Sequence, residues 1–273
     1  MRSFLVSLAR RMPPGLLRRI GAWQWSSPLA RRLVTASSNW LRRQDVVIAH
    51  GVAKGLRFNA AGANPAYALG ISEPMVQEWI ARMVKPRDVV YDIGANVGFF
   101  TVILARLVGH GGVVAAFEPL PASARAAQHN ADLNGFTHVK ILPRAVGRRA
   151  GTVKLELQQE STWARLATDG TPGPTVDVEM VAIDSLVADG TLAPPQVMKI
   201  DVEGAELEVM EGMRDTIVRH RPLILCEMHG KNAEFAALME TLGYDVRCLE
   251  GDQPLATAPW DVHAVATPRV RGA

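Results

Sequence analysis

Residues 89–101 read Val-Val-Tyr-Asp-Ile-Gly-Ala-Asn-Val-Gly-Phe-Phe-Thr, and this stretch decides the fold. Its first five residues are an apolar run rich in β-branched side chains, which is typical of an inner parallel strand. Gly94 and Gly98 permit a sharp turn and a close approach of ligand to backbone, and an apolar helix is expected from Phe99. A strand that ends near an acid and leads through a glycine turn into a helix favours a nucleotide-like ligand.

The spacing of the glycines narrows the class of ligand. The dinucleotide fingerprint G-x-G-x-x-G fails because Asn96 and Phe99 occupy its second and third glycine positions, and no Gly-Lys-Ser/Thr of a P-loop follows. What remains is D-x-G-x-N-x-G, headed by Asp92, and an acid suits a ligand with an amino group and no phosphate. S-adenosylmethionine (SAM), which is cationic at sulfur, is such a ligand. The alternative is a plain strand–helix turn that binds nothing.

Two further strand ends carry charged residues. The apolar run 113–117 ends at Glu118-Pro119, at a distance from the glycine turn where a carboxylate accepts hydrogen bonds from ribose hydroxyls. In the run from 197, Lys199, Asp201 and Glu203 alternate and therefore point the same way in an extended chain. Three charges at a strand's carboxyl end are costly to bury without purpose. The alternative at the second strand is a solvated acid. The alternative at the third is an ion pair of Lys199 with Asp201, together with a separate acid that caps the following helix.

At this point the chain resembles a known family. The segments D-I-G-A-N-V-G, F-E-P and K-I-D-V-E-G-A-E, in this order, are similar to those of the FkbM-type SAM-dependent methyltransferases. The similarity extends over residues 65–268 and includes a G-x-x-E stretch at 70–73 and a strand that ends in Glu227-Met228-His229. The segments 130–134 and 145–147 resemble the family's adenine-side segments.

The resemblance implies a class I, Rossmann-like fold, and the alternation of apolar segments favours the same α/β architecture. We expect a doubly wound, mostly parallel seven-stranded sheet, with its last two strands forming an antiparallel hairpin at one edge. The expected strands lie near 89–93, 113–117, 139–142, 197–201, 223–227, 244–248 and 261–267. The expected helices lie near 74–84, 99–108, 121–134, 205–219 and 231–242, and further strands are expected at 153–157 and 176–181.

The motifs and the resemblance together give the candidate site. The candidate cofactor-binding residues are Glu73, Asp92, Gly94, Asn96, Gly98, Glu118, Pro119, Ala145, Val146 and Asp201. Methylation of an alcohol needs a base with a pKa near neutrality, which favours histidine. We expect His229 or Asp201 to be the base, with Glu203 orienting the substrate. A satisfied surface histidine is one alternative, and a divalent metal held by Asp201, Glu227 and His229 is another.

Charge is distributed unevenly along the chain. The net charge is +3, but residues 1–44 hold nine of the 30 Lys and Arg residues and no acid, which leaves 21 bases against 27 acids in the remainder. We therefore divide the chain into a basic amphipathic helical extension (1–45) and a methyltransferase domain (46–273). The extension suits a helical cap, an oligomer contact, adsorption to anionic lipid or a transit segment. A nucleic-acid partner is disfavoured because no reading motif is present and the body is acidic.

Composition favours a cytoplasmic enzyme, with peripheral membrane contact as an option. Hydrophobic content of 48% and charged content of 21% are typical of a soluble globular protein, and no apolar run approaches the ~18 residues of a membrane span. The expected activity is SAM-dependent O-methylation of a hydroxyl on a sugar, a lipid-linked glycan or a polyketide-like small molecule. N-methylation, or a non-catalytic SAM-binding interaction protein, is the alternative.

Overall fold

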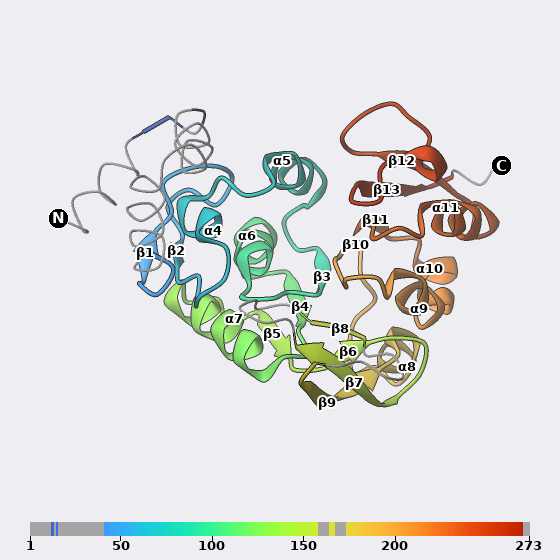
Figure 1. Ribbon diagram of the computed structural model, residues 1–273, viewed down its shortest axis with the longest axis horizontal. Coiled ribbons are helices and arrows are strands. Elements are labelled where there is room, and N and C mark those ends of the chain that lie inside the picture. The colour runs from blue at the N-terminus through green and yellow to red at the C-terminus, as the bar shows by residue number, and fades with distance from the viewer. Residues whose placement is uncertain (1–11, 14, 16–40, 158–163, 167–172, 270–273) are drawn as a thin grey trace.

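The computed structural model describes residues 12, 13, 15, 41–157, 164–166 and 173–269 (Figure 1). The predicted extension at residues 1–45 therefore lies outside the described residues, apart from 12, 13, 15 and 41–45. Its membrane or oligomer contacts stay predictions. Within the described residues, no helix is both long enough and apolar enough to cross a membrane.

The centre of the fold is a seven-stranded sheet in the order β12-β13-β11-β10-β3-β4-β5. Its strands are β3 (Val89–Ile93), β4 (Val113–Phe117), β5 (Val139–Leu142), β10 (Val197–Ile200), β11 (Leu223–Glu227), β12 (Tyr244–Cys248) and β13 (His263–Pro268). Neighbours from β5 to β11 pair in parallel, whereas β13 is antiparallel to both β11 and β12. The predicted mostly parallel sheet with an antiparallel hairpin at one edge is confirmed.

Helices cover both faces of the sheet (Figure 1). They are α4 (Pro65–Leu69), α5 (Pro74–Met83), α6 (Phe99–Val108), α7 (Pro121–Leu133), α8 (Ile183–Ala188), α9 (Glu206–Glu211), α10 (Arg214–His220), α11 (Asn232–Thr241) and the short 3₁₀ helix η1 (Leu255–Thr257). Successive residues of β3 point to opposite faces: Val90 belongs to a hydrophobic cluster that includes side chains of α4–α7, and Tyr91 belongs to a second cluster that includes side chains of α8–α11. The doubly wound arrangement follows from this alternation.

One predicted helix is wrong in its extent. The segment expected as a single helix over 205–219 is two helices, α9 and α10, which are separated at Gly212 and Met213. A Cβ at Gly212 would overlap the carbonyl oxygen of Gly147, so this glycine lets the two backbones touch. Asp184 then caps α10, because its Oδ1 accepts from the backbone N–H of Thr216 at 2.7 Å and its Oδ2 from that of Asp215 at 3.0 Å.

Two smaller sheets flank the main one. The first pairs β1 (Val46–Val47) with β2 (Arg57–Phe58). The second has the order β6-β9-β7-β8, made of β6 (Ala145–Val146), β9 (Thr175–Val181), β7 (Gly151–Leu157) and β8 (Ala164–Leu166). It contains both strands expected at 153–157 and 176–181. Side chains of β7 and β9 form one wall of the cavity described below.

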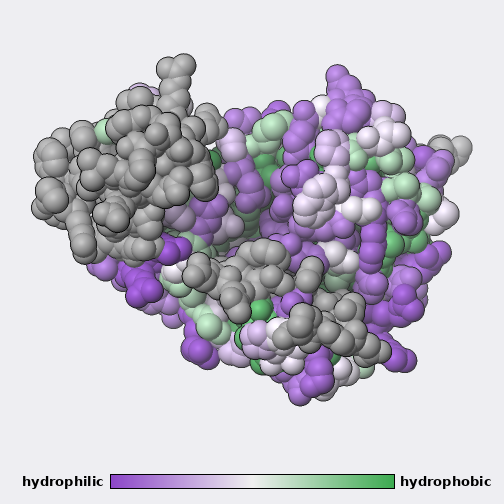
Figure 2. Space-filling model, in the orientation of Figure 1, coloured by the Kyte–Doolittle hydropathy of each residue, from purple (hydrophilic) through white to green (hydrophobic). Residues whose placement is uncertain are grey.

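The described surface is mainly polar. Hydrophilic side chains predominate on the described part of the face shown in Figure 2. Among the large hydrophobic residues that the structure describes, Trp260 is the most exposed at 62%. Both cysteines are free thiols buried in the sheet, Cys226 in β11 and Cys248 in β12.

Candidate active site

The glycine turn after β3 lies directly against the end of β10. Gly94 has a φ of +84°, and a Cβ there would overlap the carbonyl oxygen of Asp201. Gly98 has a φ of +82° and lies against α7, where a Cβ would be 2.9 Å from the Cα of Ala127. Both positions combine a left-handed backbone with close packing, and this combination requires glycine.

A cavity of about 230 Å³ opens beside this turn. Its walls are the glycine turn, the segments that follow β4 and β5, the second sheet, and the loop that follows β10. The predicted cofactor residues that line it are Gly94, Asn96, Glu118, Pro119, Ala145, Val146 and Asp201. Glu73, Asp92 and Gly98 are absent from the described lining of this cavity.

Glu118 is held rigidly at the cavity wall. Its Oε2 accepts from the backbone N–H of Asn96 and its Oε1 from that of Leu120, both at 2.8 Å. The residue is only 6% exposed, and burial raises the pKa of its carboxyl to about 7. Each carboxylate oxygen has a second lone pair, so the side chain keeps acceptor capacity for a ligand's hydroxyl groups.

Asp92 lies beneath the turn rather than in the cavity. It is completely buried, and its Oδ2 accepts a hydrogen bond from the Thr101 hydroxyl at 2.6 Å. Its Oδ1 has no hydrogen-bond partner within the described part of the chain. Burial raises the pKa of Asp92, and the nearby Lys199 ammonium partly opposes this. The acid that heads the motif thus fixes the strand end to helix α6.

Two asparagines from the predicted adenine-side segment are also structural. The Asn130 side chain accepts from the backbone N–H of Asn59 at 2.7 Å and donates to the carbonyl oxygens of Asn59 and Val97 at 2.8 Å. Asn134 makes the same kind of paired contact with the backbone of Arg57. These side chains fasten the β2 segment to α7.

Lys199 is a buried cation at the carboxyl end of β10. It is 3% exposed, its Nζ lies 3.2 Å from Asp201 Oδ2, and it lies 4.8 Å from the ring centroid of Phe100. Burial alone would lower the pKa of Lys199, but the charges of Asp201, Asp92, Glu73 and Glu227 outweigh burial and raise it. Lys199 and Asp201 line a small second cavity together with Gly94 and Asn96. The predicted ion pair is therefore present at the ligand-facing edge of the sheet.

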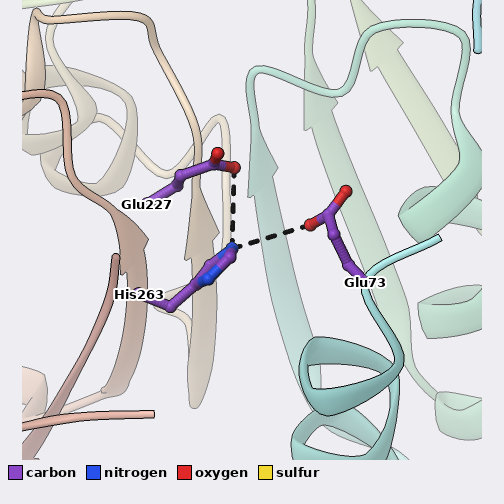
Figure 3. A group of neighbouring side chains, drawn as sticks. All are labelled: Glu73, Glu227 and His263. Atoms are coloured by element: carbon purple, nitrogen blue, oxygen red, sulfur yellow. Dashed lines mark ion pairs between the residues drawn. The ribbon is translucent and has the colours of Figure 1, made fainter. Parts of the chain in front are cut away.

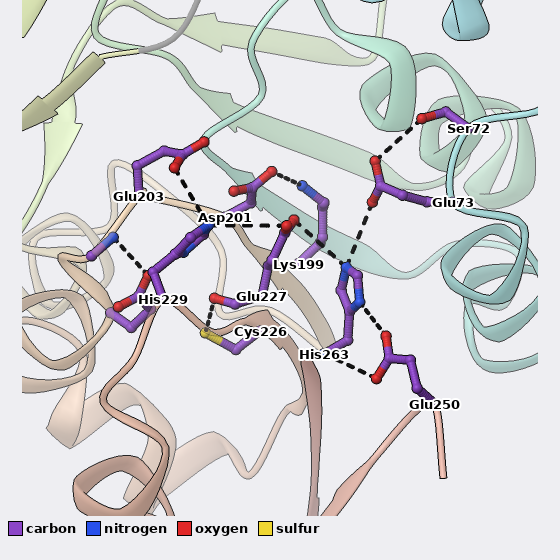
Figure 4. Close-up of polar contacts among 12 residues, drawn as sticks. Ser72, Glu73, Lys199, Asp201, Glu203, Cys226, Glu227, His229, Glu250 and His263 are labelled. Atoms are coloured by element: carbon purple, nitrogen blue, oxygen red, sulfur yellow. Dashed lines mark hydrogen bonds and ion pairs between the residues drawn. The ribbon is translucent and has the colours of Figure 1, made fainter. Parts of the chain in front are cut away.

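His229 is surrounded by carboxylates (Figure 4). Its Nδ1 lies 2.8 Å from Glu206 Oε1, and its Nε2 lies 3.4 Å from Glu203 Oε2 and 4.0 Å from Glu227 Oε1. Burial alone would lower the pKa of His229, but the hydrogen bond to Glu206 and the charge of Glu203 raise it to about 9. The His229 side chain of the ligand-free protein is therefore a cationic imidazolium near neutral pH.

Glu203 connects this cluster to the main cavity, whose wall it helps to form. Its backbone has a φ of +52°, an unusual conformation for a residue with a side chain. The next residue, Gly204, donates its N–H to Glu206 Oε1 at 2.8 Å, and the Lys231 ammonium donates to its carbonyl at 3.0 Å. Burial and the charge of Asp201 raise the pKa of Glu203 to about 7.

Glu73, one of the predicted cofactor-binding residues, lies in a second cluster of titratable side chains. It lies beside His263 and Glu227, away from the described cavity lining, and Glu250 completes the group (Figure 4). The sequence reasoning did not identify His263 or Glu250. The antiparallel register of β13 against β11 places His263 opposite Glu227, and this pairing joins segments that are distant in the sequence.

Comparison with known proteins decides the family. Residues 92–249 match the family model described as the methyltransferase FkbM domain. The chain belongs to the FkbM methyltransferase family. It is 27% identical over 222 residues to the 31-O-demethyl-FK506 methyltransferase FkbM of Streptomyces tacrolimicus. This match covers 69% of this chain and 84% of that relative.

The chain is also similar to a second curated methyltransferase and to a solved structure. The hexuronic acid methyltransferase AglP of Haloferax volcanii is 27% identical over 146 residues, covering 52% of this chain and 56% of the relative. A crystal structure of methyltransferase FkbM from Methylobacillus flagellatus is 17% identical with a TM-score of 0.47, covering 89% of this chain and 60% of that one. As a member of this family, the protein is a SAM-dependent methyltransferase.

The residues present fit SAM. The cavity is bordered by the glycine turn at Gly94, and it presents a carboxylate fixed by two backbone N–H groups at Glu118 and a buried Asn96 Oδ1 with no hydrogen-bond partner among the described residues. An unpaired buried acceptor is costly, and a ligand's ammonium group would satisfy it. No P-loop or dinucleotide fingerprint provides a phosphate cradle at this turn.

Proposed function

We propose that the protein methylates a hydroxyl group on a sugar, a lipid-linked glycan or a polyketide-like small molecule. The observation that carries this proposal is that the cavity beside the glycine turn shares Asp201 and Glu203 with a cluster of titratable side chains. The names of the relatives support it, since one acts on 31-O-demethyl-FK506 and another on hexuronic acid.

In this proposal, Asn96 and Glu118 hold the polar groups of the cofactor. Glu118 accepts hydrogen bonds from the two ribose hydroxyls, and Asn96 Oδ1 accepts one from the amino group. Ala145, Val146 and Leu155 form an apolar wall of the same cavity, which suits the adenine ring. The bound cofactor supplies an activated methyl group on a sulfonium.

The acceptor hydroxyl must lose its proton as it attacks the methyl group. We assign Glu203 as the base that accepts this proton. Both nitrogens of His229 face carboxylates, Nδ1 toward Glu206 and Nε2 toward Glu203, which leaves the ring no open acceptor. Asp201 is held by Lys199. Glu203 lines the cavity and is anchored by His229, so the roles of base and orienting group are the reverse of those expected from the sequence.

A metal at Asp201, Glu227 and His229 is geometrically allowed but is not part of this proposal. One potential ligand atom from each of these residues lies within 4.8 Å of the others. However, the Lys199 ammonium lies 3.2 Å from Asp201 Oδ2 and would repel a cation held there. Orientation of the acceptor by side chains, together with proton removal, accounts for the reaction class.

Methyl transfer from labelled SAM to a panel of hexuronic acids, lipid-linked glycans and demethylated macrolides tests the proposal. Mass spectrometry of the product distinguishes a methyl ether from a methyl amine or ester. Glu203→Gln should lower kcat by about 100-fold or more and change SAM affinity far less than it changes kcat. Glu240→Gln, at an exposed position on α11, is the control. Turnover that survives in Glu203→Gln would remove Glu203 from the mechanism.

A further inference from the structure

Three side chains from separate elements converge outside the SAM cavity (Figure 3). Glu73 stands at the start of α5, Glu227 ends β11, and His263 begins β13. His263 Nε2 lies 3.6 Å from Glu73 Oε2 and 3.6 Å from Glu227 Oε2. One potential ligand atom from each residue lies within 4.8 Å of the other two.

Two of these atoms are buried without a hydrogen bond. His263 is 9% exposed, and neither its Nε2 nor Glu73 Oε2 has a hydrogen-bond partner within the described segments. A separation of 3.6 Å is too long for a hydrogen bond. Buried polar atoms in native proteins are nearly always satisfied, so a buried nitrogen that points between two carboxylates needs an explanation.

Glu250 fixes the orientation of the imidazole. Its Oε1 lies 2.5 Å from His263 Nδ1, and its Oε2 accepts from the backbone N–H of the same residue at 3.1 Å. With its proton on Nδ1, the neutral ring directs the Nε2 lone pair toward Glu73 and Glu227. A carboxylate that orients a histidine through its other nitrogen is the usual support of a metal-binding imidazole.

The spacing suits an ion at the centre. Bonds of about 2.1 Å place neighbouring ligand atoms roughly 3.0 Å apart in octahedral and 3.4 Å apart in tetrahedral geometry. The observed 3.6 Å therefore needs only a small contraction of flexible glutamate side chains. The Ser72 hydroxyl donates to Glu73 Oε1 at 3.4 Å, which leaves Oε2 available to the ion.

The local charge also calls for a cation. Glu73, Glu227 and Glu250 surround His263. The Lys199 ammonium also acts on Glu73 and Glu227 through its charge, but its direct ion pair is with Asp201, which is not one of the three potential ligands. A protonated His263 is the competing occupant, because the same carboxylates overcome burial and raise the pKa of His263 to about 10. An incoming ion must displace this proton, as is general for histidine ligands.

We propose that Glu73, Glu227 and His263 bind a divalent transition-metal ion, with Glu250 as the positioning residue. A set of two carboxylates and one imidazole suits Mn²⁺, Fe²⁺, Co²⁺ or Zn²⁺ better than Mg²⁺. Three protein ligands leave coordination positions open for water or ligand oxygens. This inference does not depend on the identity of the methyl acceptor.

Titration of the chelator-treated full-length protein with Mn²⁺ and Co²⁺, by calorimetry and by visible absorption of Co²⁺, tests the proposal. Wild type should bind one ion per chain. Glu73→Gln and His263→Gln should each weaken binding by at least tenfold, and Glu250→Gln by about 10- to 100-fold. Glu240→Gln should bind as wild type does. Circular dichroism verifies that each variant is folded, and Glu73→Gln serves if His263→Gln does not fold.

Two results would overturn the proposal. One is the absence of Mn²⁺ and Co²⁺ binding by folded wild type up to about 1 mM ion, which would leave His263 as a structural imidazolium. The other is binding that survives in Glu73→Gln and His263→Gln but is lost in Asp201→Asn, which would place the ion in the neighbouring cluster. SAM titration of the same samples separates this failure from a failure of the proposed function.

Discussion

Protonation of Glu118 should make SAM affinity depend on pH. Burial raises the pKa of this carboxyl from 4.5 to about 7 in the ligand-free protein, while hydrogen bonds from ribose hydroxyls stabilise the ionised form. Binding below pH 7 must therefore release a proton. The dissociation constant should rise by about tenfold for each pH unit below 7, which gives roughly a 30-fold loss of affinity at pH 5.5.

The folding stability of the ligand-free protein also depends on the protonation of Glu118. Because the folded-state pKa exceeds the unfolded value, the contribution of Glu118 to stability is greatest below pH 4.5 and is lost as pH rises to about 7. The shift corresponds to about 3 kcal/mol at most. SAM binding should recover part of this cost above pH 7, where the carboxylate is already ionised.

Calorimetric titrations of SAM between pH 5.5 and 8, repeated in buffers of different ionisation enthalpy, measure both affinity and proton release. Glu118→Gln should bind about 100-fold more weakly at pH 8, since it loses two charge-assisted hydrogen bonds, and its affinity should not vary with pH. A wild-type affinity that is constant from pH 5.5 to 8 would refute the reasoning. So would an equal pH dependence in Glu118→Gln.

Three further predictions concern the support of the site. Gly94→Ala should lower the free energy of unfolding, measured by urea titration, by about 3 kcal/mol or more, because its Cβ would overlap the Asp201 carbonyl. The control Gly190→Ala, at a φ of +77° but with open space around its Cβ, should lower that free energy clearly less. Lys199→Met should cost about 3 kcal/mol by leaving buried carboxylates unpaired, and the added substitution Asp201→Asn should restore part of it; no recovery would show that the pair is not coupled. Asp184→Ala should cost about 1 to 2 kcal/mol through loss of the α10 cap, and an unchanged urea midpoint would show that the cap is dispensable.

The main sheet could be predicted from the sequence because its signals are local. Val89–Ile93 and Val197–Ile200 are short, mainly apolar runs with a charged residue next to the carboxyl end. Glycine turns with acids mark where a parallel sheet binds its ligand. Glu118, in the cavity lining, directly follows the apolar run 113–117, whereas Val146 is identified through the resemblance to the family. These parts of the site depend on neighbours in sequence.

The remaining features depend on contacts between distant segments. The break between α9 and α10 arises because the backbone of Gly147 meets Gly212, and no local pattern reports that contact. His263 joins Glu73 only because β13 inserts beside β11. The protonation of His229 likewise depends on Glu203, in the loop after β10, and on Glu206, at the start of α9. Sequence pattern and spacing therefore predict which residues form the candidate site, but they do not predict the charge states of those residues or their contact partners.

Titration of the wild-type protein with SAM, with ATP and NAD⁺ as phosphate-bearing controls, tests the central claim most directly. The account predicts micromolar binding of SAM, loss of that binding in Glu118→Ala, and no comparable binding of either control, because no phosphate cradle follows Gly94. Failure of the folded wild-type protein to bind SAM, or tighter binding of a phosphate-bearing nucleotide, would contradict the assignment of the cavity.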